Sequence, residues 1–480
     1  MLRIIYYHVG KGDMSLVLMP NGDAMMVDCY KAEQVVDGEL ADGSTVFDRI
    51  ERHILEHREL VARSNPMLVP LVANEKAKKK KVPIAVLAIT HADRDHITGR
   101  KELKSRFEIG QLIDSGRDYT DSSDATKDYL AFRKEMKDAN KYVAFKRANY
   151  NVWQASLAIV DILCPNRDIA ADEDNNNQCL VIRVQYGGRS FLFTGDSPLD
   201  DWVNEKTGIL KMHEAKVPTQ FLNASHHGSR TFFTPPGPRL DGQPEYTKEE
   251  YDTRALKKIA PRISFITCSD DEEADHPHPI ALECYHEETN PALEGSGKSH
   301  VILSRDSQHL HHVACADGSF YMRTSRSRIN SVNVGAAAAG PYLEGTVSSQ
   351  NGYQTPSGIW VSREPLSANV LVSFAVEAKG KWSGPVSFDW WVINNGHGSG
   401  ELHREFYTMD SKDRKKDSKW SRNLAYEGVH LMQCHATTED GKDWANWCAL
   451  ICQQDSLLHA ERWLQLFPGC IDPTRINRKR

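Results

Sequence analysis

Four short apolar segments, each followed within a few residues by histidine or aspartate, constrain the fold of this chain more than any other feature. The first, residues 83–89, precedes His91-Ala92-Asp93-Arg94-Asp95-His96, and the later ones precede Asp196, His226-His227 and His276. Apolar runs of this length are typical of buried strands, and loops that follow neighbouring strands can meet in space. The sequence therefore predicts a sheet edge that gathers these side chains around a metal site.

Imidazole and carboxylate groups at this spacing are ligands for Zn²⁺, Mn²⁺ or Fe, and their number favours two ions over one. Two ions roughly 3.5–4 Å apart can activate a water molecule at neutral pH and neutralise charge that develops on phosphate oxygens. A chance cluster of surface residues is the alternative. The pattern predicts a dinuclear hydrolase that acts on phosphate esters.

The motifs together resemble the metallo-β-lactamase fold, in the branch typified by the DNA-uptake protein ComEC and phosphorylcholine esterases. The resemblance covers about residues 1–320 and predicts an αββα sandwich. It depends on five motifs, which are Val9-Gly10-Lys11-Gly12-Asp13, the His91–His96 segment, Gly195-Asp196, Ser225-His226-His227-Gly228-Ser229 and His276-Pro277.

The resemblance also implies a role for each motif residue. His91 and Asp93 would hold one ion, Asp95, His96 and His227 the other, and Asp196 would bridge them, while His226 would face the substrate phosphate. The predicted catalytic residues are Asp95, His226 and His276, because a histidine can donate a hydrogen bond to a phosphoryl oxygen or protonate a leaving group. The predicted substrate-binding residues are Lys11, Asn177 and Ser229.

Two departures from the branch pattern are visible. Lys11 stands where the branch usually has Gln, and Asp28-Cys29-Tyr30 replaces Asp-Thr-Gly; neither departure is expected to touch a metal ligand. The third histidine of the first metal site in β-lactamases has no counterpart, and Asn177 occupies roughly that place in the order. A larger share of the ligand atoms would then be oxygen, which suits Mn²⁺ as well as Zn²⁺. The expected cofactors are therefore two divalent ions, either Zn²⁺ or Mn²⁺.

Composition narrows the class of protein. The chain has 480 residues, enough for two or three domains, and its formal charge of 59 − 65 = −6 is unlike that of a dedicated nucleic-acid binder. Basic runs at Lys76–Lys81 and Arg475–Arg480 could touch phosphates, with solvated loops as the alternative. The ten cysteines lack a Cys-x-x-Cys pair, so buried free thiols are favoured over a zinc knuckle near Cys434 and Cys448.

We expect no secretion signal, because the first residues read as a strand, and the apolar runs stay far below the roughly 20 residues that span a bilayer. The sequence analysis therefore predicts a cytoplasmic protein without a membrane partner.

A second domain is predicted after a segment rich in small residues. The predicted organisation is a hydrolase domain at 1–325, a linker at 326–345, a sensor-like domain at 346–465 and a basic tail at 466–480. Eight of the ten tryptophans lie between Trp360 and Trp463, so the composition changes at the linker.

Residues 386–396, Arg404-Glu405-Phe406 and residues 426–435 resemble the adenylyl/guanylyl cyclase and SMODS C-terminal sensor domain. That resemblance implies a mainly β domain that binds a nucleotide or a phage-derived ligand; an ordinary β-sandwich core is the alternative. Trp390 and Trp391 point to opposite faces of one strand, so only one can belong to the core. The fold class predicted for the whole chain is α/β, an αββα sandwich followed by this smaller β domain.

Three functions remain open at this stage. The favoured one is a nuclease or phosphodiesterase that acts on DNA or another nucleic acid as the ligand-gated effector of a bacterial antiphage defence system, with a possible defence partner protein. The second is a phosphodiesterase that degrades a cyclic nucleotide second messenger. The third is an inactive nucleotide-binding protein. The DNA-uptake resemblance and the basic run at Lys76–Lys81 favour a polymeric substrate.

Overall fold

The computed structural model describes most of the chain. Its described residues are 1–31, 45–64, 81–119, 123–155, 157–168, 174–234, 246–269, 276–289, 301–307, 309–314, 320–324, 342–347, 352–354, 360–362, 370–379, 383–395, 404–406, 419–424, 428–438 and 444–453. The chain divides into two compact units. The first contains Met1–Ala292 and Val301–Gly318, and the second contains Leu293–His300 and Ser319–Arg480.

One sheet of the first unit has the strand order β14-β1-β2-β3-β4-β5-β6. Its strands β1, β2, β3 and β14 pair antiparallel, whereas β3, β4, β5 and β6 pair parallel. The pairing of β14 with β1 joins segments that are far apart in the sequence. The bounds are β1 Leu2–Tyr6, β2 Ser15–Leu18, β3 Ala24–Val27, β4 Val82–Ala88, β5 Phe107–Asp114, β6 Tyr142–Ala144 and β14 Leu310–Ala314.

The other sheet has the order β13-β12-β11-β10-β9-β8-β7. Strands β7 to β10 pair antiparallel and β10 to β13 pair parallel. The bounds are β7 Asn149–Ala155, β8 Ala158–Cys164, β9 Val181–Tyr186, β10 Arg189–Phe193, β11 Phe221–Asn223, β12 Ile263–Ile266 and β13 Val301–Leu303.

The helices of this unit are mostly short, and their starts follow local sequence signals. At the start of α1, Thr45 Oγ1 accepts from the Asp48 N–H at 3.3 Å and Asp48 Oδ2 accepts from the Thr45 N–H at 2.6 Å, which satisfies two backbone donors reciprocally. The bounds are α1 Val46–Ser64, α3 Arg94–Ile97, α4 Arg100–Arg106, α5 Asp124–Asp138, α6 Leu199–Val203, α7 Ile209–Met212, α8 Arg254–Ile259, α9 Pro279–Glu288 and α10 Ser304–Ser307, with 3₁₀ turns η2 Glu214–Lys216, η3 Ser225–Gly228, η4 Arg230–Phe232 and η5 Lys248–Glu250.

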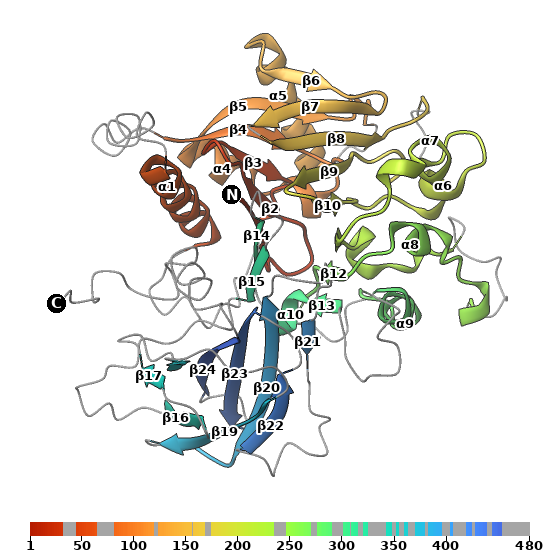
Figure 1. Cartoon of the computed structure of the whole chain (residues 1–480). Coiled ribbons are helices and arrows are strands. Elements are labelled where there is room, and N and C mark those ends of the chain that lie inside the picture. Colours follow the sequence, from red (N-terminus) through yellow and green to blue (C-terminus); the bar gives the residue numbers. More distant parts are fainter. Residues whose placement is uncertain are drawn as a thin grey trace. The chain divides into compact units, whose positions relative to one another are not determined.

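The two sheets lie face to face between two helical layers (Figure 1). Buried residues of α1 and α5 form one core with β1 to β5, and buried residues of α6, α8 and α9 form another with β10 to β12. Between the sheets, the ring of Tyr6 lies 5.6 Å from that of Phe193 and 5.0 Å from that of Phe265. The predicted αββα sandwich is therefore confirmed.

Every described element of the second unit is a strand, which confirms the expected mainly β domain. Its sheets have the orders β16-β19-β22 and β17-β18-β24-β23-β20-β21. Trp390 is fully buried beside Phe374 and Met432, so it is the core member of the tryptophan pair. The bounds are β15 Phe320–Thr324, β16 Tyr342–Val347, β17 Gly352–Gln354, β18 Trp360–Ser362, β19 Val370–Lys379, β20 Val386–Asn395, β21 Arg404–Phe406, β22 Lys419–Leu424, β23 Gly428–Thr438 and β24 Trp444–Gln453.

Several predicted segments lie outside the described residues. These are most of the linker at 326–345, the basic tail at 466–480 and the lysines at 76–80. The domain boundaries therefore stay predictions. The cysteines whose side chains are described are free and buried, as expected: Cys29, Cys164, Cys179, Cys268, Cys284 and Cys434. Within the described ranges, none of the helices combines the length and apolarity needed to cross a bilayer.

Candidate metal centre

The register of the parallel strands brings the predicted ligand loops together. Phe193 of β10 pairs with Asn223 of β11, which pairs in turn with Phe265 of β12. Asp196 lies three residues after Phe193, and His226 lies three residues after Asn223. Both residues therefore follow their strands at the same edge of the sheet. The His91–His96 segment follows β4 of the other sheet. The expectation of a single sheet edge was wrong, because ligands come from the carboxyl ends of strands in both sheets.

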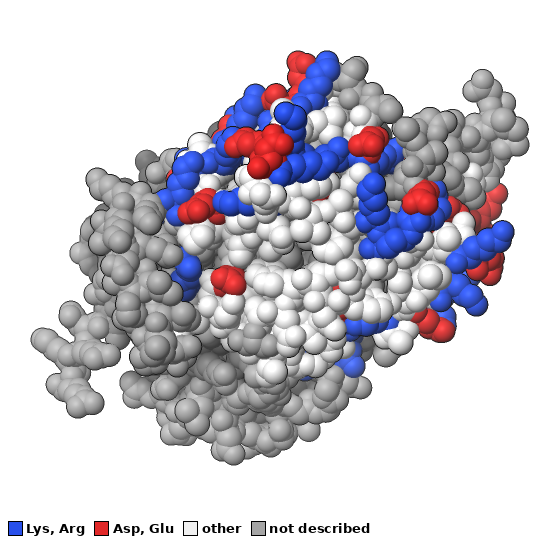
Figure 2. All heavy atoms as spheres, turned by 90° about the horizontal axis from the view of Figure 1, so that it is seen from above, with Lys and Arg blue, Asp and Glu red and all other residues white. Residues whose placement is uncertain are grey.

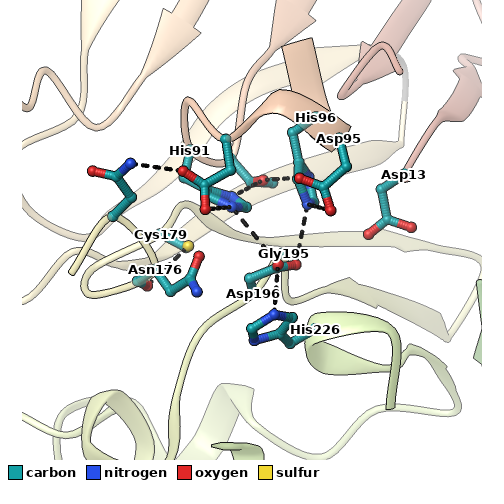
Figure 3. A network of polar contacts seen from close by, with 12 residues as sticks. Asp13, His91, Asp95, His96, Asn176, Cys179, Gly195, Asp196 and His226 are labelled. Atoms are coloured by element: carbon teal, nitrogen blue, oxygen red, sulfur yellow. Dashed lines mark hydrogen bonds and ion pairs between the residues drawn. The ribbon is translucent and has the colours of Figure 1, made fainter. Parts of the chain in front are cut away.

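Asp196 lies at the middle of the cluster, and its two oxygens face different neighbours (Figure 3). Oδ2 is 3.7 Å from His91 Nε2 and 3.5 Å from His226 Nε2, whereas Oδ1 is 3.2 Å from His96 Nε2. The Asp196 side chain is only 3% exposed. One carboxylate therefore faces two groups of histidines, which is the arrangement required of a bridging ligand.

The remaining predicted ligands complete the two groups. Asp93 Oδ2 lies 3.6 Å from His91 Nε2, on one side of Asp196. On the other side, Asp95 Oδ2 lies 3.3 Å from His227 Nε2 and 3.9 Å from His96 Nε2. All six side chains predicted to bind metal are thus within one connected cluster.

Four buried atoms of this cluster make no hydrogen bond. They are Nε2 of His91, His96 and His227, and Oδ1 of Asp196. Leaving such atoms unpaired away from water costs about 1–3 kcal/mol each, so a buried group of them needs an explanation. A divalent cation among them would supply the missing partner.

The outer ring nitrogens of the histidines are all oriented by acceptors. His96 Nδ1 lies 2.9 Å from Asp28 Oδ2, and a carboxylate can only accept there, so Nδ1 carries the proton. Thr267 Oγ1 donates to Asp13 at 2.5 Å and therefore accepts from His227 Nδ1 at 2.8 Å. In its neutral form, each ring consequently presents the Nε2 lone pair to the cluster, which is the tautomer that a metal ligand needs.

His91 is oriented in the same way through Thr90. Thr90 Oγ1 donates to Asp28 Oδ2 at 2.8 Å, so it accepts from His91 Nδ1 at 3.1 Å. Asp28 also accepts from the Thr90 N–H at 2.8 Å. The expectation that the Asp28-Cys29-Tyr30 segment touches no metal ligand was wrong, because the Asp28 carboxylate contacts His96 directly and holds His91 through Thr90.

Asp13 is a further residue that sequence reasoning did not assign to the metal site. Its carboxylate belongs to a potential metal-binding group with His96, Asp196 and His227, in which one possible ligand atom from each residue lies within 4.8 Å of the others. Burial raises the pKa of Asp13, and the nearby His227 and His96 oppose that rise. The signal in the sequence was its place in the Gly12-Asp13 motif directly ahead of β2.

The carboxylates and histidines of the cluster shift one another's pKa values. Burial would lower the pKa of His96, but Asp196, Asp28 and Asp95 raise it well above the usual value. Burial would also lower the pKa of His227, but Asp13 and Asp196 raise it to about 9. Burial would raise the pKa of Asp196, yet His226 and His96 hold it well below its usual range. The site thus favours bound cations, whether protons or metal ions.

The backbone around the histidine pair is held in an unusual conformation. His226 and His227 have φ values of +48° and +54°, a region that non-glycine residues enter at a cost of about 1–3 kcal/mol each. The adjoining Gly228 has φ +78°, and a Cβ there would lie 2.8 Å from Pro277 Cβ. The close approach of the Pro277 loop requires this glycine. Such strain is typical of functional sites.

The other predicted residues lie around the cluster at differing depths. His276 lies beside His226, with ring centroids 5.2 Å apart, and His226 Nδ1 is 3.0 Å from Thr231 Oγ1. Ser229 is buried, and its Oγ accepts from the Thr231 N–H at 3.3 Å. Lys11 is exposed in the turn between β1 and β2.

The asparagine that contacts the first ligand group lies two residues before the predicted Asn177. Asn175, rather than Asn177, donates to Asp93 Oδ1 at 2.7 Å. The carbonyl of Asn177 accepts from Arg117 at 3.4 Å. The predicted role of Asn177 in substrate binding stays a prediction.

Comparison with known proteins supports both resemblances. Residues 333–446 match the family model of the adenylyl/guanylyl and SMODS C-terminal sensor domain. The chain is 21% identical over 275 residues to ComE operon protein 3 of Bacillus subtilis (strain 168), a match that covers 57% of this chain and 30% of that protein. The chain therefore spans less than a third of the length of this relative.

Two solved structures are also similar. One is a diphosphatase from the PhnP family (12% identity, TM-score 0.28, covering 68% of this chain and all of that one), and the other is unliganded yeast PDE1 (9% identity, TM-score 0.34, covering 63% and 97%). TM-scores this low carry no conclusion, so the αββα assignment depends on the sheets described above. The chain combines a region similar to ComE operon protein 3 with a C-terminal segment that matches the sensor-domain family.

Proposed function

We propose that this protein is a phosphodiesterase that depends on two divalent metal ions, Zn²⁺ or Mn²⁺. The observation that carries the proposal is the convergence of buried Nε2 atoms and Asp196 Oδ1 without hydrogen-bond partners. The residues would divide into His91 and Asp93 on one ion, Asp95, His96 and His227 on the other, and Asp196 between them.

Ions bound in this way lower the pKa of water and neutralise charge on phosphate oxygens. Around them, the chain contributes groups for positioning and proton transfer. His226 is 21% exposed at its side chain, so it can reach both Asp196 and a bound substrate. Since Thr231 Oγ1 donates to Ser229, it accepts from His226 Nδ1, and Nε2 is left to take up or deliver a proton. Asp95 and His276 complete the proposed catalytic set.

A nucleic acid is the proposed substrate, and a cyclic nucleotide is the second candidate. The similarity to ComE operon protein 3 and the resemblance to the DNA-uptake branch favour a polymer. The sensor-domain match favours a nucleotide ligand and, with it, the cyclic-nucleotide alternative. Surface charge does not decide between them, because on the face in Figure 2 Lys and Arg side chains lie among Asp and Glu side chains.

Hydrolysis assays with the full chain test the proposal. Protein loaded with Mn²⁺ or Zn²⁺ is expected to cut single-stranded or plasmid DNA, and Asp196→Ala is expected to abolish the cutting, while Asp124→Ala, an exposed aspartate on α5, is expected to leave it unchanged. Intact DNA with rapid loss of a cyclic dinucleotide would establish the second candidate. Bound metal well below one ion per chain would contradict both.

We further propose that the C-terminal domain senses a nucleotide and gates the hydrolase as an effector in antiphage defence. The support is the family match at residues 333–446. If the domain inhibits the enzyme in the absence of ligand, removal of residues 341–480 raises basal hydrolysis. Unchanged activity after truncation would contradict the gating.

A further inference from the structure

A basic pocket lies beside the metal centre in the first unit. It has a volume of about 170 Å³ and is lined by loops that follow β5, β6 and β8. Its charged lining residues are the cations Arg117, Lys146, Arg147 and Arg167 and the acids Asp118 and Asp168. Four cations minus two carboxylates leave a net charge of +2, in a chain whose overall charge is −6.

The deeper wall of the pocket is firmly built. Arg117 is only 6% exposed, and its backbone oxygen accepts from Arg133 Nη1 at 2.6 Å. Arg133 also lies 3.4 Å from Asp114 Oδ2, and Asp114 Oδ1 accepts from the Gly116 N–H at 2.7 Å. The loop after β5 is therefore fixed to α5 by a buried network.

Glycine at position 116 allows the loops to approach one another. Its φ is +70°, and a Cβ at that position would lie 2.6 Å from the Cβ of Ala144 and 3.3 Å from Lys146 Cε. A side chain at 116 would thus force the β6 loop away, together with Lys146. The close packing places the Lys146 stem against the wall that Arg117 forms.

A short loop connects the pocket to the metal centre. The Arg117 guanidinium donates to the carbonyls of Asp174 and, at 3.4 Å, of Asn177. From the same loop, Asn175 donates to Asp93 Oδ1 at 2.7 Å. The loop at residues 174–177 therefore contacts both Arg117, which lines the pocket, and Asp93 of the first ligand group.

The cations at the rim are available to a ligand. Lys146 makes no ion pair with any residue that the structure describes. Arg147 lies 2.8 Å from Asp168, but these side chains are 50% and 90% exposed, so the pair contributes little and a phosphate can replace the carboxylate.

We propose that this pocket binds a backbone phosphate of a single-stranded nucleic acid, adjacent to the phosphate that is cleaved. The proposal rests on the proposed function and makes it more specific, since a polymer presents a second phosphate at a fixed spacing. Arg117 forms the rigid wall of the subsite, and Lys146 and Arg147 supply the exposed positive charge that offsets the phosphate.

Binding to a fluorescein-labelled twelve-nucleotide DNA, measured by anisotropy with full-length protein in an Asp196→Ala background, tests the subsite without cleavage. Lys146→Glu and Arg147→Glu are each expected to raise Kd about three- to tenfold and to reduce the slope of log Kd against log salt by about 0.7. Lys211→Glu, an exposed lysine on α7, is the matched control and keeps the parent Kd.

The outcomes separate this proposal from the proposed function. Equal Kd values for Lys146→Glu, Arg147→Glu and Lys211→Glu overturn the subsite, even if the protein cleaves DNA. If Lys146→Glu and Arg147→Glu lose as much affinity for a mononucleotide as for the labelled DNA, the assignment of the subsite to a polymer is overturned. If wild-type protein cleaves no phosphodiester but the Lys146 and Arg147 variants lose DNA affinity, the subsite stands and the hydrolase proposal fails. Unchanged melting temperatures of the variants establish that folding is intact.

Discussion

At the residue scale, the orientation of the histidines explains why the cluster suits a cation better than a hydrogen-bond network. Asp28, Thr90 and Thr267 accept from the Nδ1 atoms, so in the neutral form of each ring the Nε2 lone pair faces the centre of the cluster. Histidines arranged only for packing would have no reason to share this tautomer. The metal proposal therefore depends as much on these outer partners as on the ligands.

Asp28→Asn tests the outer partners. The variant keeps the shape of the side chain but removes the negative charge beside His96, and we expect metal affinity to fall about 10- to 100-fold. Metal bound per chain after dialysis against graded free Mn²⁺ or Zn²⁺ measures the change. Asp124→Asn, at an exposed aspartate, is the control; equal metal affinity in the two variants would contradict the role of Asp28.

His57 provides a pH-dependent contribution to stability away from the site. Burial lowers its pKa to about 3, and its Nε2–H donates to the Met19 carbonyl at 2.7 Å. The unfolded histidine has a pKa near 6.5, so as the pH falls the unfolded chain takes up a proton before the folded chain does. The contribution of neutral His57 to the free energy of unfolding is therefore fully present above pH 6.5 and is lost as the pH falls toward 3. Between pH 7 and 5 the loss is about 2 kcal/mol.

Denaturant unfolding of wild type and His57→Gln at pH 7, 6 and 5 measures this loss. Glutamine can still donate to Met19 but does not titrate, so we expect a flatter pH dependence for the variant. Parallel pH profiles for the two proteins would contradict the assignment.

Sequence reasoning could group the candidate ligands that follow one another closely in the chain. His91 to His96 and His226-His227 could be assigned because each group lies in one short loop. Asp28 and Asp13 could not, because their partners His96 and Thr267 lie 68 and 254 residues away. A carboxylate that acts through a hydroxyl leaves no pattern in the local sequence.

At the element scale, the centre depends on turns that follow strands of both sheets. Gly195, between β10 and Asp196, has φ +51°, and a Cβ there would lie 2.8 Å from the Cβ of Thr90. The turn after β10 therefore packs against the residue that orients His91. The apolar runs predicted these strands, but the sequence could not show that β4 and β10 belong to different sheets, because either strand order preserves the same pattern of buried residues.

Gly195→Ala tests this contact. The methyl group would strain the turn and push Thr90, so we expect loss of bound metal and of hydrolysis. Gly188→Ala is a matched control, because Gly188 has φ +73° but nothing within 4 Å of an added Cβ. Both variants carry similar backbone strain, of about 1 kcal/mol, and only the first disturbs the site. Similar metal content in the two would contradict the proposed contact.

At the scale of the whole molecule, bound ions would join the two sheets of the first unit, since His91 and His96 come from one and Asp196 and His227 from the other. A ligand that binds only the folded state stabilises it by about 4 kcal/mol at a thousandfold excess over Kd. The second unit has its own core around Trp390.

Chelation of the purified protein is therefore expected to lower the melting temperature of one transition and leave a second unchanged. Calorimetry before and after dialysis against EDTA, with restoration by Mn²⁺ or Zn²⁺, measures the effect. An equal shift of both transitions, or no shift, would contradict a metal site confined to the first unit.

The pairing of β1 with β14 has a consequence for synthesis of the chain. The backbone N–H of His8, just after β1, donates to the ring of His309, 301 residues later. During translation, one edge of the first strand stays without its partner until nearly the whole first unit has left the ribosome, and contacts of such long range form slowly. Throughout that interval, β1 offers an open strand edge on which neighbouring nascent chains could aggregate and which a chaperone could cover.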